Sequence, residues 1–142
     1  MIFADETFPT LRDLACELGQ VQIQWSFLET EMRRQLATSD GPERPFRGPI
    51  IARWRVYAQR MASEQKMMAE HLDAVEPIAR TRNLLAHGIE QVSADPRTAS
   101  TAFIVCVDSE GVKNTLTIDE IRELSVEIDR VRRSMWLGRS LS

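Results

Sequence analysis

The sequence predicts a mainly α-helical protein, a bundle of about four helices with one β-hairpin inserted before the last helix. Apolar residues recur at alternating steps of three and four along most of the chain, the spacing of one helix face. Over about residues 101–116 the pattern changes to short runs rich in β-branched residues around a turn. With 142 residues the chain is long enough for one compact core, so we expect a single domain over residues 1–142.

The first helix is expected over about residues 10–37. Its apolar seam follows the helical spacing through Leu11, Leu14, Leu18, Val21, Trp25, Leu28 and Met32. A second apolar stripe lies to one side of this seam and consists of Cys16, Ile23 and Phe27. Two apolar stripes are typical of a helix that buries one face inside its subunit and a second face against a partner.

Two more helices are expected, over about residues 50–61 and 64–87. The segment 39–49 before them holds three prolines and two glycines, which predict a loop. The longer of the two helices has a seam of Met68, Leu72, Val75, Ala79, Arg82 and Ala86. Gly88 follows it directly, and we expect this glycine to end the helix in a left-handed conformation.

The hairpin is expected over about residues 101–116, with its turn at 108–111. Thr117 and Glu120 then have the spacing of a capping box, in which each side chain accepts a hydrogen bond from the other residue's backbone amide. A last helix over about residues 118–137 follows from this box and from its apolar seam. We expect the tail from Gly138 onward to be frayed.

Composition limits the classes of partner. The formal charge of −3 and the pI near 5.5 exclude a strong attraction of the whole molecule to nucleic acid or to an anionic membrane, so an RNA contact would need a local basic patch. No apolar run approaches the roughly 20 residues of a membrane helix, and residues 1–9 lack the pattern of a signal peptide. These observations favour a cytoplasmic protein that does not bind membranes.

No cofactor or metal site is predicted. Cys16 and Cys106 are far apart in apolar surroundings, which favours free thiols over a disulfide or a zinc pair. His71 and His87 lack the spacing of metal ligands, and the apolar neighbours of His71 predict a histidine packed in the core.

The hexapeptide Arg82-Asn83-Leu84-Leu85-Ala86-His87 is the strongest candidate site. Arg82 places a bulky cation at a seam position between two alanines, and such a break in an apolar pattern indicates a function or a specific buried partner. Asn83 and His87 lie on the neighbouring polar stripe. On an ideal helix Arg82 and His87 point about 140° apart, so the long guanidinium or a distorted helix end must bring them to one atom.

This hexapeptide resembles the Arg-polar-x3-His motif of the HEPN superfamily. The order of elements from about Leu11 to Gly88 is also similar: a long helix, a loop with a shorter helix, and a helix that carries the motif near its end. The resemblance implies a HEPN-like helical bundle that forms a homodimer and acts as a metal-independent endoribonuclease, as in toxin–antitoxin and defence systems. It places Arg82 and His87 of both subunits in one catalytic cleft, with Asn83 as the polar residue of the motif.

The residue types suit that chemistry. A histidine side chain exchanges protons near neutral pH, as the ribose 2′-hydroxyl and the leaving 5′-oxygen require. Arg82 would place two donors on phosphate oxygens and stabilise the negative charge of the transition state. Asn83 would orient the imidazole or hold a phosphate oxygen. The expected reaction is RNA cleavage by the internal 2′-hydroxyl, which leaves a cyclic phosphate and needs no metal.

Other interpretations stay open at the level of sequence. The chain can instead be a non-catalytic HEPN-like module that binds a cognate antitoxin or another partner protein, with the motif holding the dimer together. His87 would then satisfy the last carbonyls of its helix, and Arg82 would pair with an acid such as Glu29 or Glu31. The acidic pI favours this interpretation, whereas the intact motif favours the ribonuclease. A small ligand in the bundle groove is a third possibility without a residue pattern of its own.

Overall fold

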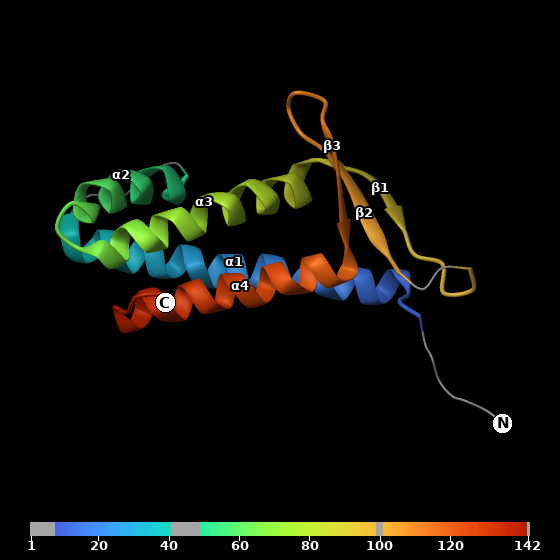
Figure 1. The fold of residues 1–142 in the computed structure, drawn as a ribbon, viewed down its shortest axis with the longest axis horizontal. Helices are drawn as coiled ribbons and strands as arrows, with labels where there is room; N and C mark the ends of the chain where they lie inside the picture. Colours follow the sequence, from blue (N-terminus) through green and yellow to red (C-terminus); the bar gives the residue numbers. More distant parts are fainter. Residues whose placement is uncertain (1–7, 41–48, 99–100, 142) are drawn as a thin grey trace. The chain divides into compact units, whose positions relative to one another are not determined.

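The computed structural model describes residues 8–40, 49–98 and 101–141. These residues form four α-helices and one three-stranded antiparallel sheet (Figure 1), which confirms the mainly helical class. The elements follow one another as α1 (Leu11–Asp40), α2 (Ile50–Ala62), α3 (Lys66–His87), β1 (Ile89–Ser93), β2 (Phe103–Val107), β3 (Lys113–Thr117) and α4 (Ile118–Leu137). Residues 41–48, most of the loop expected over 39–49, lie outside the described residues.

The described residues divide into two compact units. The first unit comprises Met1–Gln22 and Arg80–Ser125 and contains the whole sheet. The second unit comprises Ile23–Ala79 and Val126–Ser142 and contains only helices. Three of the helices, α1, α3 and α4, contribute one part to each unit.

The helix ends differ slightly from the expected ones. The third helix was expected from about residue 64 and begins at Lys66, because the chain leaves α2 through a turn in which the amides of Glu64 and Gln65 both donate to the carbonyl of Met61, at 3.0 and 2.9 Å. The capping box before α4 is confirmed. The amide of Thr117 donates to Oε1 of Glu120 at 3.1 Å, and the amide of Glu120 donates to Oγ1 of Thr117 at 3.2 Å.

The expected hairpin is part of a larger sheet. Its two strands are β2 and β3, paired from Phe103 with Thr117 to Val107 with Lys113. The expectation of a single hairpin is wrong because β1 adds a third strand on the other side of β2. Four of its five side chains are exposed and the fifth is partly buried. Backbone hydrogen bonds hold this strand, so its side chains carry no alternating pattern that predicts it.

The core of the first unit lies on one face of β2. Along this strand Ile104 and Cys106 are buried, whereas the alternate residues are only partly buried, as in a strand with one covered face. The helix seams supply the rest of the core in this unit, and its fully covered apolar residues are Leu14, Val21, Leu85, Ala102, Ile104, Cys106, Ile118 and Ile121.

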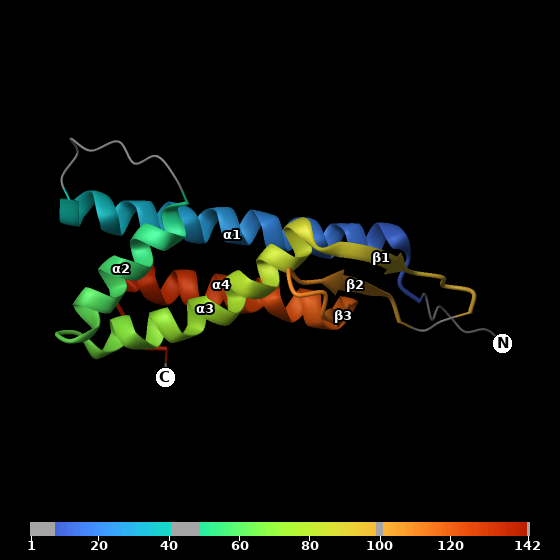
Figure 2. The ribbon, with the colours of Figure 1, turned by 90° about the horizontal axis from the view of Figure 1, so that it is seen from above.

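In the second unit α2 runs between α1 and the first part of α3 (Figure 2). Side chains of α2 bond to both of these helices. The buried Trp54 donates its indole N–H to Oε1 of Gln35 on α1 at 2.8 Å. Arg55 forms an ion pair with Glu76 on α3 at 2.6 Å. His71 is fully buried in this unit, which confirms the prediction of a core histidine.

The C-terminal tail is anchored, so the expectation of a frayed tail is wrong. Gly138 takes a left-handed conformation with φ 63°, and the amides of Gly138 and Arg139 return to the carbonyls of Met135 and Ser134, a Schellman ending. The buried His71 then bonds the carbonyl of Arg139 through Nε2 at 2.8 Å. The anchors lie on a helix distant in sequence, so the composition of the tail does not reveal them.

Glu70 completes this anchor. Its carboxylate accepts hydrogen bonds from the Ser140 hydroxyl and from the Leu141 amide, the latter at 3.1 Å. These two hydrogen bonds, the hydroxyl first, lower the pKa of Glu70. A carboxyl whose pKa is lowered by folding stabilises the folded form above its unfolded pKa of about 4.3, and this stabilisation is lost as the pH falls through the folded pKa.

We therefore expect the tail to detach in acid before the helices unfold. Amide exchange by NMR should show Leu141 protected at pH 7 and progressively less protected below about pH 4. Glu70→Gln should reduce this protection already at pH 7, and Glu64→Gln, at an exposed glutamate just before α3, should not. Equal protection of Leu141 in wild type and Glu70→Gln at pH 7 would contradict the assignment.

Candidate functional site

The predicted hexapeptide forms the end of α3 in the first unit. Arg82 is half-buried, whereas Asn83 and His87 are exposed. His87 is the last residue of the helix. Arg82, the residue that interrupts the apolar seam, is therefore partly covered, and the exposed imidazole of His87 follows it at the end of the helix.

Two amide oxygens hold the guanidinium of Arg82. Its Nη1 donates to Oδ1 of Asn83 at 3.4 Å, and its Nη2 donates to Oε1 of Gln22 on α1 at 3.3 Å. Both acceptors are neutral amide oxygens, and the two bonds orient the guanidinium. Glu31, one of the two acids considered as a partner of Arg82, forms its own ion pair with Arg34 one turn along α1.

Several exposed arginines of the protein form ion pairs with carboxylates. Arg122 bonds Glu17 at 3.1 Å and Asp119 at 2.9 Å, and Arg130 bonds both carboxylate oxygens of Glu127. In such pairs the carboxylate offsets the positive charge locally.

The position of His87 depends on the glycine that follows it. The amide of Gly88 donates to the carbonyl of Leu84 at 2.7 Å, and its carbonyl accepts from the amide of Val107 in β2 at 2.8 Å. A Cβ atom at position 88 would lie 2.6 Å from the oxygen of Val107 and 3.1 Å from that of Leu84. The backbone of Gly88 therefore packs directly against β2 and fixes the end of α3.

The expected left-handed conformation of Gly88 is wrong. Among the residues with described placement, the glycines with positive φ are Gly111 and Gly138. Gly88 is instead required because a side chain has no room between α3 and β2. A sequence alone shows a glycine after a helix and cannot distinguish a left-handed turn from such a close approach.

Replacing Gly88 by alanine should destabilise the protein by about 1–3 kcal/mol, because the new methyl group collides with backbone atoms that cannot rotate away. Gly19→Ala is the matched control. Gly19 lies within α1, and a Cβ there meets nothing within 4 Å, so alanine should stabilise the helix by about 0.5–1 kcal/mol. Chemical denaturation of both variants measures the difference, and a Gly88→Ala protein as stable as wild type would rule out the close packing.

The site residues are only partly brought together. Gln22, Arg82 and Asn83 form one hydrogen-bonded group, whereas the imidazole of His87 makes no hydrogen bond to any other residue in ranges 8–40, 49–98 and 101–141. Gln22 was not predicted from the sequence. The available signal was its place next to the seam residue Val21, but nothing in the sequence connects it with an arginine 60 positions away.

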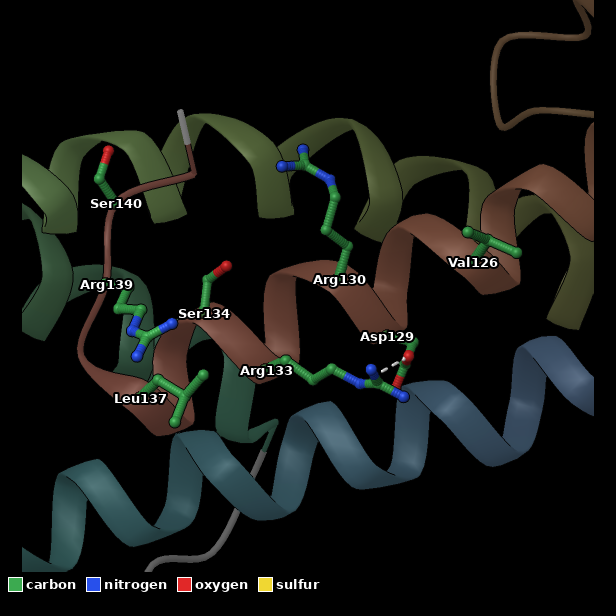
Figure 3. A pocket seen from close by; sticks show the side chains of 8 residues that line it. All are labelled: Val126, Asp129, Arg130, Arg133, Ser134, Leu137, Arg139 and Ser140. Atoms are coloured by element: carbon green, nitrogen blue, oxygen red, sulfur yellow. Dashed lines mark ion pairs between the residues drawn. The ribbon is translucent and has the colours of Figure 1, made fainter.

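The second unit contains a surface hollow of about 550 Å³ at the basic end of α4. Figure 3 shows that its arginines do not converge: Arg133 turns along the helix to Asp129, at 2.9 Å, while Arg130 points toward α3. Arg130 is also bonded to Glu127 and to the carbonyl of Leu141. These cations are already occupied, so the hollow lacks the converging polar groups of an anion site.

Other chemistry-bearing residues lie apart from one another. Within the described part of the chain, no group of three or more His, Cys, Asp or Glu residues is placed to hold a metal ion. Cys16 is exposed and Cys106 is buried, both as free thiols, and burial raises the pKa of the Cys106 thiol. None of the four described helices has both the length and the apolar composition needed to cross a membrane.

Comparisons with known proteins give no family assignment. No protein-family model matches the chain, and neither the curated proteins nor the solved structures contain a match to it. The resemblance to the HEPN superfamily therefore depends on the hexapeptide and on the order of the helices, and a function must be argued from the residues themselves.

Proposed function

We propose that the protein is a homodimeric, metal-independent ribonuclease of HEPN type, in which Arg82 and His87 are catalytic and Asn83 is supporting. The observation that carries this proposal is a half-buried arginine, oriented by two neutral amide oxygens, in the last turns of a helix that ends on an exposed histidine. A toxin or defence role in the cytoplasm, with RNA as substrate and a cognate antitoxin as partner, belongs to the same proposal.

Arg82 would act on the scissile phosphate. Its planar guanidinium can place two parallel N–H groups on the non-bridging oxygens, which gain negative charge as the phosphorus becomes five-coordinate. The amide oxygens of Gln22 and Asn83 accept hydrogen bonds from this group and orient it. Donors that are already aligned stabilise the transition state without a cost of reorganisation.

His87 would transfer protons. As the ribose 2′-oxygen attacks phosphorus, one imidazole takes its proton, and the bond from phosphorus to the 5′-oxygen breaks as that oxygen receives a proton from a second acid. The products are a 2′,3′-cyclic phosphate and a 5′-hydroxyl. Each chain supplies one such exposed histidine, so a dimer in which two copies of His87 share a cleft would provide both the base and the acid.

The exposed stripe on α1 supports an association between subunits. Ile23 and Phe27 in the second unit are each 49% exposed, and Cys16 earlier on the helix is also exposed. Apolar side chains on one helix face commonly mark a protein interface. The same stripe also supports the alternative of a non-catalytic HEPN-like module bound to an antitoxin or another protein, in which Gln22, Arg82 and Asn83 would only join α3 to α1 within the first unit.

Purified wild-type protein should cleave single-stranded or structured RNA in the presence of EDTA and leave cyclic phosphate ends. Arg82→Ala and His87→Ala should each lower the rate by about 10²–10³, the usual effect of removing a charge-stabilising donor or a proton-transfer group. Arg80→Ala removes an exposed arginine from the same helix and should leave the rate within about twofold. Absence of cleavage by the wild type across these substrates would reject the ribonuclease and favour the binding module.

The dimer can be tested separately from the chemistry. Light scattering should give twice the 16.2 kDa of one chain, and Phe27→Ser should shift the protein toward the monomer by weakening an apolar contact. Val56→Ser is the control, because Val56 is an exposed apolar residue on α2, outside the stripe. A Phe27→Ser protein that remains dimeric at low micromolar concentration would show that the stripe is not the interface.

A further inference from the structure

The segment Arg139–Leu141, which we call the strap, is held against the second unit by side chains of two helices. It leaves the end of α4 after Gly138 and runs toward α3 (Figure 3). His71 and Glu70 bond it from α3, and Arg130 bonds it from α4. Two of its three residues are exposed and the third is half-buried, so the strap lies on the surface.

The contacts involve mainly the backbone of the strap. Nε2 of His71 donates to the carbonyl of Arg139 at 2.8 Å, and Nη1 of Arg130 donates to the carbonyl of Leu141 at 3.1 Å. Oε2 of Glu70 accepts from the amide of Leu141 at 3.1 Å and from the hydroxyl of Ser140. Three of these four bonds use backbone groups, which nearly every residue carries, and the fourth selects a hydroxyl side chain.

The buried donor of His71 favours an occupied site. Its side chain is 0% exposed, and its Nδ1 has no hydrogen-bond partner within the described residues. The carbonyl of Arg139 is the acceptor for the other ring nitrogen, Nε2. A buried donor that loses its acceptor is unfavourable, so a segment that replaces the strap must present a carbonyl at the same place.

The strap can leave without unwinding α4. The amides of Gly138 and Arg139 close the helix by donating to the carbonyls of Met135 and Ser134, and the contacts of the strap come after this closure. A surface hollow of about 550 Å³ borders Arg139 and Ser140 (Figure 3). This hollow leaves room for the flanking residues of a longer segment.

We propose that Glu70, His71 and Arg130 form a binding site for an extended peptide segment of a partner protein, which displaces the strap from it. The segment that fits presents a backbone carbonyl, then a residue with a hydroxyl side chain, then a residue with a free amide and a carbonyl, as in x-Ser-x or x-Thr-x. The site lies in the second unit and the hexapeptide in the first, and this inference does not depend on the proposed ribonuclease.

The test opens the strap and supplies the same segment as a free peptide. Ser140→Ala together with Leu141→Pro removes the hydroxyl and the amide that Glu70 binds, and leaves the side chains of the site in place. The probe is an acetylated and amidated peptide with the sequence of residues 137–141, Leu-Gly-Arg-Ser-Leu. NMR titration of the ¹⁵N-labelled double variant should shift the amides around Glu70, with a Kd of about 0.1–1 mM. Binding to wild type should be at least about tenfold weaker, because the tethered strap competes.

Glu70 provides the matched comparison. In the double variant, Glu70→Gln should weaken peptide binding at least about tenfold, because a charged acceptor of two hydrogen bonds is lost. Glu64→Gln, at an exposed glutamate just before α3, should leave binding within about twofold. A peptide with alanine in place of serine should bind about tenfold more weakly when Glu70 is present, and this difference should shrink to about twofold in Glu70→Gln. The peptide comparison changes no residue of the protein, so it does not depend on how a variant folds.

Three results would overturn the inference. The first is the absence of amide shifts around Glu70 in the double variant at about 5 mM peptide. The second is equal affinity for wild type and the double variant, which would show that the peptide binds without displacing the strap. The third is an affinity that Glu70→Gln leaves unchanged. In wild type, excess peptide should also lower the exchange protection of the Leu141 amide, and unchanged protection with the peptide bound would likewise reject displacement.

Discussion

The close contact between Gly88 and β2 is the constraint on which the candidate site depends. The carbonyl of Gly88 accepts from the amide of Val107 at 2.8 Å, in a space that a Cβ atom would overlap. This one contact ends α3, leads the chain into the sheet, and fixes the last helical residue, His87. The site is therefore built on a junction between a helix and a strand, and its geometry is set by backbone atoms that have little freedom to move.

Charge is the second organising feature. The chain carries a net charge of −3, and arginines such as Arg55, Arg122 and Arg130 are bonded to carboxylates. At Arg82 two amide oxygens, from Asn83 and Gln22, accept hydrogen bonds from the guanidinium and orient it. Comparisons with known proteins give no family assignment, so the proposal for the hexapeptide is argued from its own residues.

Much of the fold could be predicted because its signals are local. The helical spacing of apolar residues located all four helices, and the capping box at Thr117 and Glu120 located the start of α4. The strand β1 could not be predicted, since exposed residues held by backbone hydrogen bonds leave no side-chain pattern. The anchored tail escaped prediction for a related reason: Glu70 and His71 bind it from far along the chain.

For the candidate site, the sequence by itself determined which residue types stand at the end of α3 and that Arg82 interrupts an apolar seam. Spacing along a helix fixes those relations before any tertiary contact forms. Only the tertiary structure decided that Gln22 bonds Arg82 and that Gly88 is needed for space rather than for a left-handed turn. Both facts concern atoms brought together by packing between distant segments, and no local pattern records which distant partner a side chain or a backbone group will meet.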